Sequence, residues 1–215
     1  MENIGIRIVH WKKLEERKKM MDKQIVHLSK NIKNIEWVDW FDRDTLTWDD
    51  IQENYCPLNT VLLRPLTLGE ISNGMAHNHI LSTVKGINMV IEDDVILKPN
   101  FIQNVDKVLE IAPVDWDVIV LGYHFSEPTF VEKEKITLTI AEKSNIHTCC
   151  FLIKEKIAER ITQHFLFKPF PTTIDHTLCI ILPDIDAKVY HVDPWLCFEG
   201  SKVGLFDTSF KERGF

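Results

Sequence analysis

The stretch NMVIEDDVIL (residues 88–97) places three consecutive acids between two apolar triplets. A short apolar run of this kind is typical of a buried strand, so the acids should lie where the strand ends. Alternation along an extended chain would put Glu92 and Asp94 on one face and Asp93 on the other. Neighbouring carboxylates repel one another, and a hard divalent cation such as Mg²⁺ or Mn²⁺ relieves that repulsion. The alternative is a solvated strand end whose acids cap the following helix.

Strand and helix patterns alternate on both sides of this stretch. Further strands are expected at residues 4–9, 35–41, 116–123, 135–141, 147–153 and 187–192. Helices are expected at residues 14–31, 67–85, 99–111, 154–165 and 175–182, with an irregular loop over 44–64. This order predicts a single α/β domain with a mainly parallel sheet covered by helices on both faces.

Ligands of such sheets bind beyond the carboxyl ends of the strands. The strand-end candidates are therefore His10, Asp42, the three acids Glu92 to Asp94, and Tyr123 with His124.

Composition narrows the classes of function. The chain has 215 residues and a net charge of −7, which argues against a nucleic-acid partner. Its five cysteines form no zinc or CxxC pattern, as expected for reduced thiols in a cytoplasmic protein. No stretch has the pattern of a signal peptide or a transmembrane helix. The basic residues 12–23 could contact a membrane peripherally, although their interleaved acids favour a solvated helix face.

Common nucleotide-binding motifs are missing from the sequence. There is no GxGxxG fingerprint, no GxxxxGK[ST] loop and no GxSxG elbow. His77 and His79 are two residues apart on a predicted helix, so their side chains diverge and cannot share one metal ion.

The sequence contains the motif RPLTLGEISNGMAH (residues 64–77) and, shortly after it, VIEDDV (residues 90–95). Together these two motifs resemble glycosyltransferase family 25. Segments 6–20, 35–42, 116–122, 148–154 and 171–178 follow in the family's order. The family includes lipooligosaccharide galactosyltransferases of bacteria and procollagen galactosyltransferases. The resemblance implies a GT-A fold, a nucleotide-sugar donor (usually UDP-galactose), Mn²⁺ dependence and inversion at the anomeric carbon.

The resemblance also assigns roles to particular residues. Glu92, Asp93 and Asp94 stand at the family's DxD-like acids, Gly69, Glu70 and His77 match its central helix motif, and Arg17 matches its retained arginine. Asp42 would lie near the nucleoside. The sequence departs from the family at Ser72-Asn73, Ala76, His10 and His176.

These assignments give a complete candidate site. Glu92, Asp94 and a late histidine, His191, are the expected metal ligands. The expected donor-binding residues are Arg17, Asp42, Arg64, Glu70, His77 and Asp93. An inverting transfer needs a base to accept the acceptor's proton, and Asp175 is the candidate, with His176 as the alternative.

Each assignment has a structural alternative. Asp175 could cap a helix, Glu70 occupies a capping-box position three residues after Thr67, and the arginines could form surface ion pairs. His191 could be a buried histidine satisfied near Trp195.

The expected function is transfer of a hexose, most simply galactose, to a hydroxyl of a glycan or a hydroxylated protein. Residues 1–125 would form the nucleotide-sugar half and residues 126–215 the acceptor half. Two other readings stay open: an inactive domain that only binds glycan or protein, and a different metal-dependent nucleotidyl enzyme.

Overall fold

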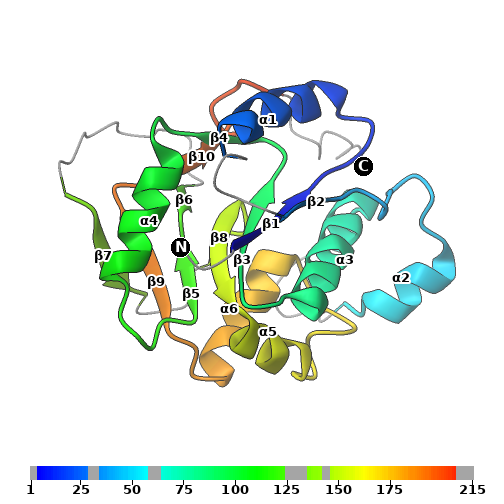
Figure 1. Ribbon diagram of the computed structural model, residues 1–215. Coiled ribbons are helices and arrows are strands. Elements are labelled where there is room, and N and C mark those ends of the chain that lie inside the picture. Colours follow the sequence, from blue (N-terminus) through cyan, green and yellow to red (C-terminus); the bar gives the residue numbers. More distant parts are fainter. Residues whose placement is uncertain (1–3, 29–33, 58–63, 124–134, 142–145, 207–215) are drawn as a thin grey trace.

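The computed structural model describes residues 4–28, 34–57, 64–123, 135–141 and 146–206. Within these residues the main sheet has seven strands (Figure 1), in the spatial order β2 (Asn34–Val38), β1 (Ile4–Val9), β3 (Ile87–Glu92), β8 (Cys150–Lys154), β5 (Val118–Val120), β9 (Val189–Asp193) and β7 (Thr137–Ile140). Strands β8 and β7 are antiparallel to their neighbours, and the other pairings are parallel. The predicted mainly parallel α/β sheet is confirmed.

Helices cover both faces of this sheet (Figure 1). Helices α1 (Glu15–Leu28) and α4 (Phe101–Ile111) lie on one face, and α3 (Leu68–Thr83), α5 (Glu155–Thr162) and α6 (Ile174–Asp184) lie on the other, whereas α2 (Trp48–Asn54) packs against α3. The side chains of β3 alternate between the two faces of the sheet. Met89 and Ile91 pack in the core with α1 and α4, whereas Val90 packs with α3, α5 and α6. Glu92, next in that alternation after Val90, is thereby directed toward α3.

The acidic stretch is divided differently from the expectation. Strand β3 ends at Glu92, the next two acids form a turn, and β4 (Val95–Leu97) begins a second sheet. Among the described residues that sheet has three strands, in the order β4, β10 (Cys197–Glu199) and β6 (Gly122–Tyr123). Strand β10 is not predicted from the sequence, and it brings the end of the described chain beside the acids.

Helix α2 lies inside the segment expected to be an irregular loop. Its capping box is formed by Thr47 and Asp50, with the same geometry that Thr67 and Glu70 provide for α3. In both boxes the threonine hydroxyl accepts from the third helical N–H, and the acid accepts from the threonine N–H. Each box satisfies backbone donors that the first helical turn leaves without partners.

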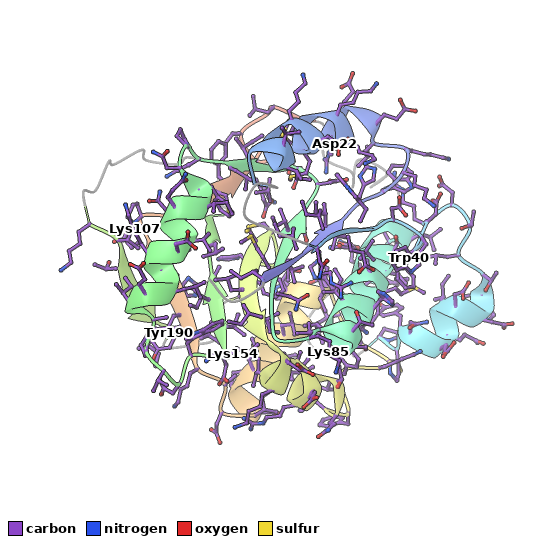
Figure 2. The ribbon with its side chains drawn as sticks, viewed as in Figure 1. Asp22, Trp40, Lys85, Lys107, Lys154 and Tyr190 are labelled. Atoms are coloured by element: carbon purple, nitrogen blue, oxygen red, sulfur yellow. The ribbon has the colours of Figure 1, made fainter. Side chains whose placement is uncertain are left out.

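The surface carries charges of both signs. The side chains of Asp22, Lys85 and Lys107, labelled in Figure 2, are exposed. On α1 two lysines lie near acids of their own helix, Lys18 at 3.5 Å from Asp22 and Lys19 at 3.6 Å from Glu15. Within the described residues, no helix is long and apolar enough to cross a membrane. All five cysteines are free thiols.

Candidate active site

A pocket lies at the carboxyl ends of β1, β2 and β3, where ligands of open α/β sheets bind. It has a volume of about 120 Å³. Its walls come from the end of β1 and the turn after it, the start of α1, the end of β2 and the segment after it, helix α3, the acidic turn, and the end of β10 with the segment that follows. The lining residues are Val9, His10, Trp11, Leu14, Arg17, Val38, Phe41, Arg43, Gly69, Ser72, Asn73, Ala76, Glu92, Asp93, Asp94, Glu199, Ser201 and Lys202.

Asp93 is held by two basic side chains. His10 Nδ1 lies 2.7 Å from Asp93 Oδ2, and Arg17 Nη1 donates to Oδ1 at 2.9 Å. All three side chains are buried. Arg17 Nη1 also lies 3.4 Å from Asp94 Oδ2, so one guanidinium is shared between two acids. Because both oxygens of Asp93 are engaged, this acid orients Arg17 rather than capping a helix.

Glu92 points to the other side of the turn, toward α3. Its Oε1 lies 3.1 Å from Thr148 Oγ1, 3.3 Å from His77 Nε2 and 3.4 Å from Asn73 Nδ2. Burial acts to raise the pKa of Glu92, but hydrogen bonds from His77, Asn73 and Thr148 outweigh it and hold that pKa below its ordinary value. Glu92 and Asp93 thus lie on opposite faces as predicted, whereas Asp94 turns toward Arg17.

Asp94 and Glu199 carry strongly perturbed carboxyls. Burial and the nearby Glu92 raise the pKa of Asp94 to about 6, although Arg17 and a hydrogen bond from Ser201 act to lower it. Burial, Glu92 and Asp94 raise the pKa of Glu199 to about 9. Glu199 reaches the pocket because it pairs with Val95 across the small sheet, and Gly200 N donates to Asp94 O at 2.8 Å.

The carboxylates of Glu92, Asp94 and Glu199 therefore crowd one site. Among the described residues, Asp94 Oδ1 is a buried oxygen without a hydrogen-bond partner. Crowded carboxylates with an unsatisfied oxygen form a donor set that suits a hard cation. Within the same part of the chain, no three His, Cys, Asp or Glu side chains are yet arranged around a common metal position.

Comparison with known proteins decides the class of enzyme. The sequence profile described as "Glycosyltransferase family 25 (LPS biosynthesis protein)" matches residues 4–178. The chain belongs to glycosyltransferase family 25. It is accordingly a glycosyltransferase, and the family that its motifs predict is confirmed. No curated protein sequence matches this glycosyltransferase.

The fold of the glycosyltransferase is supported by one solved structure with a TM-score above 0.5. A glycosyltransferase involved in the glycosylation of the major capsid of PBCV-1 is 9% identical, with 92% of each chain covered and a TM-score of 0.51. The inositol-1-phosphate CTP transferase from T. maritima is 13% identical, with 91% of this chain and 89% of that one covered and a TM-score of 0.49. The predicted GT-A fold is confirmed.

The structure brings most of the predicted site residues of this glycosyltransferase together. Arg17 and the three acids line the pocket, and His77 contacts it through Glu92. Asp42 lies between the pocket residues Phe41 and Arg43 in the sequence, and its Oδ1 accepts a hydrogen bond from Trp11 Nε1 at 2.9 Å. Asp175 lies at the start of α6. Its pKa is raised mainly by burial and, to a smaller extent, by the nearby negative charge of Glu92.

Four predicted residues lie elsewhere. Arg64 forms two hydrogen bonds, of 2.8 and 2.7 Å, to the carboxylate of Glu70 at the start of α3, and neither residue lines the pocket. His176 is exposed, and its Nδ1 lies 2.8 Å from Thr173 Oγ1. His191 packs against the rings of Trp195 and His147.

His191 is not beside the carboxylates for a topological reason. It lies on β9, three strands from β3 in the sheet order, which corresponds to roughly 14 Å at the usual strand spacing. Glu199 reaches the carboxylates instead. A signal for it exists in the sequence, since Glu199 follows Cys197-Phe198 as an acid at the end of an apolar run. His124, another strand-end candidate, lies outside the described residues.

Proposed function

We propose that this glycosyltransferase transfers galactose from UDP-galactose to a hydroxyl of a glycan or protein, with inversion and with Mn²⁺ or Mg²⁺ as cofactor. The observation that supports the proposal is the convergence of Glu92, Asp94 and Glu199 beside Arg17, at the carboxyl end of the sheet. This position is the one at which an open α/β sheet receives a nucleotide ligand.

The proposed metal ligands are the carboxylates of Glu92, Asp94 and Glu199, with Glu199 in place of His191. Burial and, after it, repulsion between the carboxylates raise the pKa values of Asp94 and Glu199, and a cation would offset both effects. A bound cation supplies positive charge to the diphosphate that departs from the sugar. Since the three side chains do not yet surround one point, cation binding would draw their oxygens together.

Arg17 is the proposed partner of the diphosphate. Its guanidinium is fixed by Asp93, which is in turn held by His10, so Arg17 needs little reorganisation to meet a ligand. The wall near Asp42 suits the nucleoside, because the Arg43 guanidinium stacks 3.5 Å from the centre of the Trp11 ring, and Phe41 lies beside it in the pocket. Planar groups of this kind offer stacking surfaces to a base.

Asp175 is the proposed base. Its pKa is raised by burial and by Glu92, and a general base works best when its pKa approaches the working pH. The alternative, His176, is exposed.

Turnover of a panel of nucleotide sugars, with Mn²⁺ and with a chelator, tests this function. We expect UDP-galactose to release UDP with Mn²⁺ and not with chelator present. A nucleotidyl enzyme would release pyrophosphate from a nucleoside triphosphate instead, and a binding domain would release neither product. Transfer that persists at full rate in the chelator would contradict the role of the carboxylates.

A further inference from the structure

The two carboxylate oxygens of Glu92 have different surroundings. Oε1 receives three donors, from Thr148 at 3.1 Å, His77 at 3.3 Å and Asn73 at 3.4 Å. Within the described residues, no hydrogen bond is made to Oε2. Glu92 lines the pocket and 22% of its side chain is exposed. The geometry separates an oxygen that is held by the protein from one that is available to a ligand.

The donors to Oε1 are rigidly placed. Asn73 and His77 are four residues apart on α3 and so share one face of the helix. His77 is fully buried, with its ring stacked on Phe151 at a centroid distance of 6.3 Å. Thr148 is 4% exposed and directly precedes Cys149, whose carbonyl accepts from Glu92 N at 2.9 Å. This backbone bond fixes Thr148 relative to Glu92.

We propose that Asn73, His77 and Thr148 are positioning residues that hold Glu92 Oε1, so that Glu92 offers a divalent cation only its second oxygen, Oε2. Thr148, with the shortest contact, is the principal member. The inference rests on the proposed metal function of the pocket. Nothing in it requires these three residues to touch the cation or the sugar donor.

One-oxygen coordination has a consequence for the choice of metal. Three donors directed at Oε1 compete with a metal ion for its lone pairs, so they disfavour Glu92 as a bidentate ligand. Ca²⁺ commonly takes bidentate carboxylates in a flexible shell of six to eight oxygens, whereas Mg²⁺ requires a compact octahedron. The three donors therefore favour a small octahedral cation, Mn²⁺ or Mg²⁺, over Ca²⁺.

The test is the dissociation constant of Mn²⁺ and of Ca²⁺, measured by calorimetry on the full chain without donor. Thr148→Val keeps the shape of the side chain and removes its hydroxyl, and Thr148→Ser restores the hydroxyl. Loss of a group that orients a metal ligand commonly weakens the metal 10- to 100-fold. We expect about that loss of Mn²⁺ affinity in Thr148→Val, a smaller loss for Ca²⁺, and near wild-type binding in Thr148→Ser.

Thr177→Val is the matched control. Thr177 is fully buried on α6, and its hydroxyl donates to Thr172 O at 3.2 Å, so this variant loses a comparable buried hydrogen bond away from Glu92. Its Mn²⁺ affinity should be unchanged. If Thr148→Val does not fold, Asn73→Ala removes another donor from a half-buried position and should weaken Mn²⁺ in the same direction.

The outcomes separate the two proposals. Wild-type Mn²⁺ affinity in a folded Thr148→Val protein, or in Asn73→Ala where that variant replaces it, overturns the positioning role and leaves the metal site standing. An equal loss in Thr177→Val also overturns the role, because the effect would then be one of general stability. A wild-type chain that binds neither Mn²⁺ nor Mg²⁺ overturns both the positioning role and the metal-dependent function.

Discussion

At the scale of single residues, the three consecutive acids have three different environments. Asp93 is hydrogen-bonded to His10 and Arg17, Glu92 is held by donors from α3 and Thr148, and Asp94 keeps an oxygen without a partner among the described residues. Glu199 joins them from a distant part of the sequence. The negative charge of these carboxylates is available to a bound cation. Without a cation, it should affect the stability of the folded protein.

Glu199 should make the stability of the metal-free protein depend on pH. Its folded pKa of about 9 lies above the ordinary value of 4.5, so the folded state holds a proton that the unfolded state releases. The free energy of unfolding should therefore fall as the pH rises from about 4.5 to about 9. Asp94, whose pKa is raised from 3.8 to about 6, should likewise lower the free energy of unfolding as the pH rises through that range.

Glu199→Gln provides the measurement. The neutral amide resembles the protonated acid, so the metal-free variant should match the wild type at pH 5 and be the more stable protein at pH 8. Urea midpoints in chelator at the two pH values report the difference. An identical pH dependence in both proteins would show that Glu199 ionises normally.

Asp175→Asn separates acid–base work from metal binding. If Asp175 is the base, transfer should fall by about 10²- to 10⁴-fold while Mn²⁺ and UDP affinities stay close to wild type. Slow hydrolysis of the donor could persist. If Asp175 only supports the start of α6, the loss should instead appear as about 1 kcal/mol of stability with near-normal turnover. A melting curve beside a transfer assay distinguishes the two results.

At the scale of elements, α3 connects the capping box, the ion pair and the pocket. Thr67, Glu70 and Arg64 fix its first turn, and one turn further on Asn73 and His77 contact Glu92. We expect Arg64→Gln to lower stability by about 1–2 kcal/mol, because the buried carboxylate of Glu70 loses a charged partner, with little change in the KM for donor.

Lys168→Gln is the control for Arg64→Gln. Lys168 lies 2.8 Å from Glu53 in an exposed pair, where the loss should be below about 1 kcal/mol. If Arg64→Gln instead raised the KM for donor strongly and left the melting temperature unchanged, Arg64 would bind the diphosphate, as expected from the sequence.

The elements also show what could be predicted from the sequence. The Thr67–Glu70 spacing predicts α3, and the same spacing at Thr47–Asp50 marks α2, where turn-forming residues led to the expectation of a loop. Local signals of this kind do not reveal β10, a three-residue strand whose partners β4 and β6 are distant in sequence. The sequence indicates His191 rather than Glu199 as the late residue beside the acids, because only long-range strand pairing reveals that Glu199 lines the pocket.

At the scale of the whole molecule, the sheet places the pocket of this glycosyltransferase at the strand ends, where ligands of open α/β sheets bind, and the ligand that we propose there is a nucleotide sugar. The net charge of −7 and the crowded carboxylates should make a bare diphosphate a poor ligand. We therefore expect the cation to bind before the nucleotide and to be held by the carboxylates.

The most direct test is the thermal stability of the protein with UDP, with Mn²⁺ and with both. Ligand that binds only the folded state stabilises it by about 2.7 kcal/mol at a hundredfold excess over its Kd. UDP with Mn²⁺ should raise the melting temperature clearly, UDP alone should raise it little, and Asp94→Asn should lose the joint effect while melting as a folded protein. A melting temperature that no nucleoside diphosphate shifts in the presence of Mn²⁺, or an Asp94→Asn protein that responds as wild type does, would contradict the account.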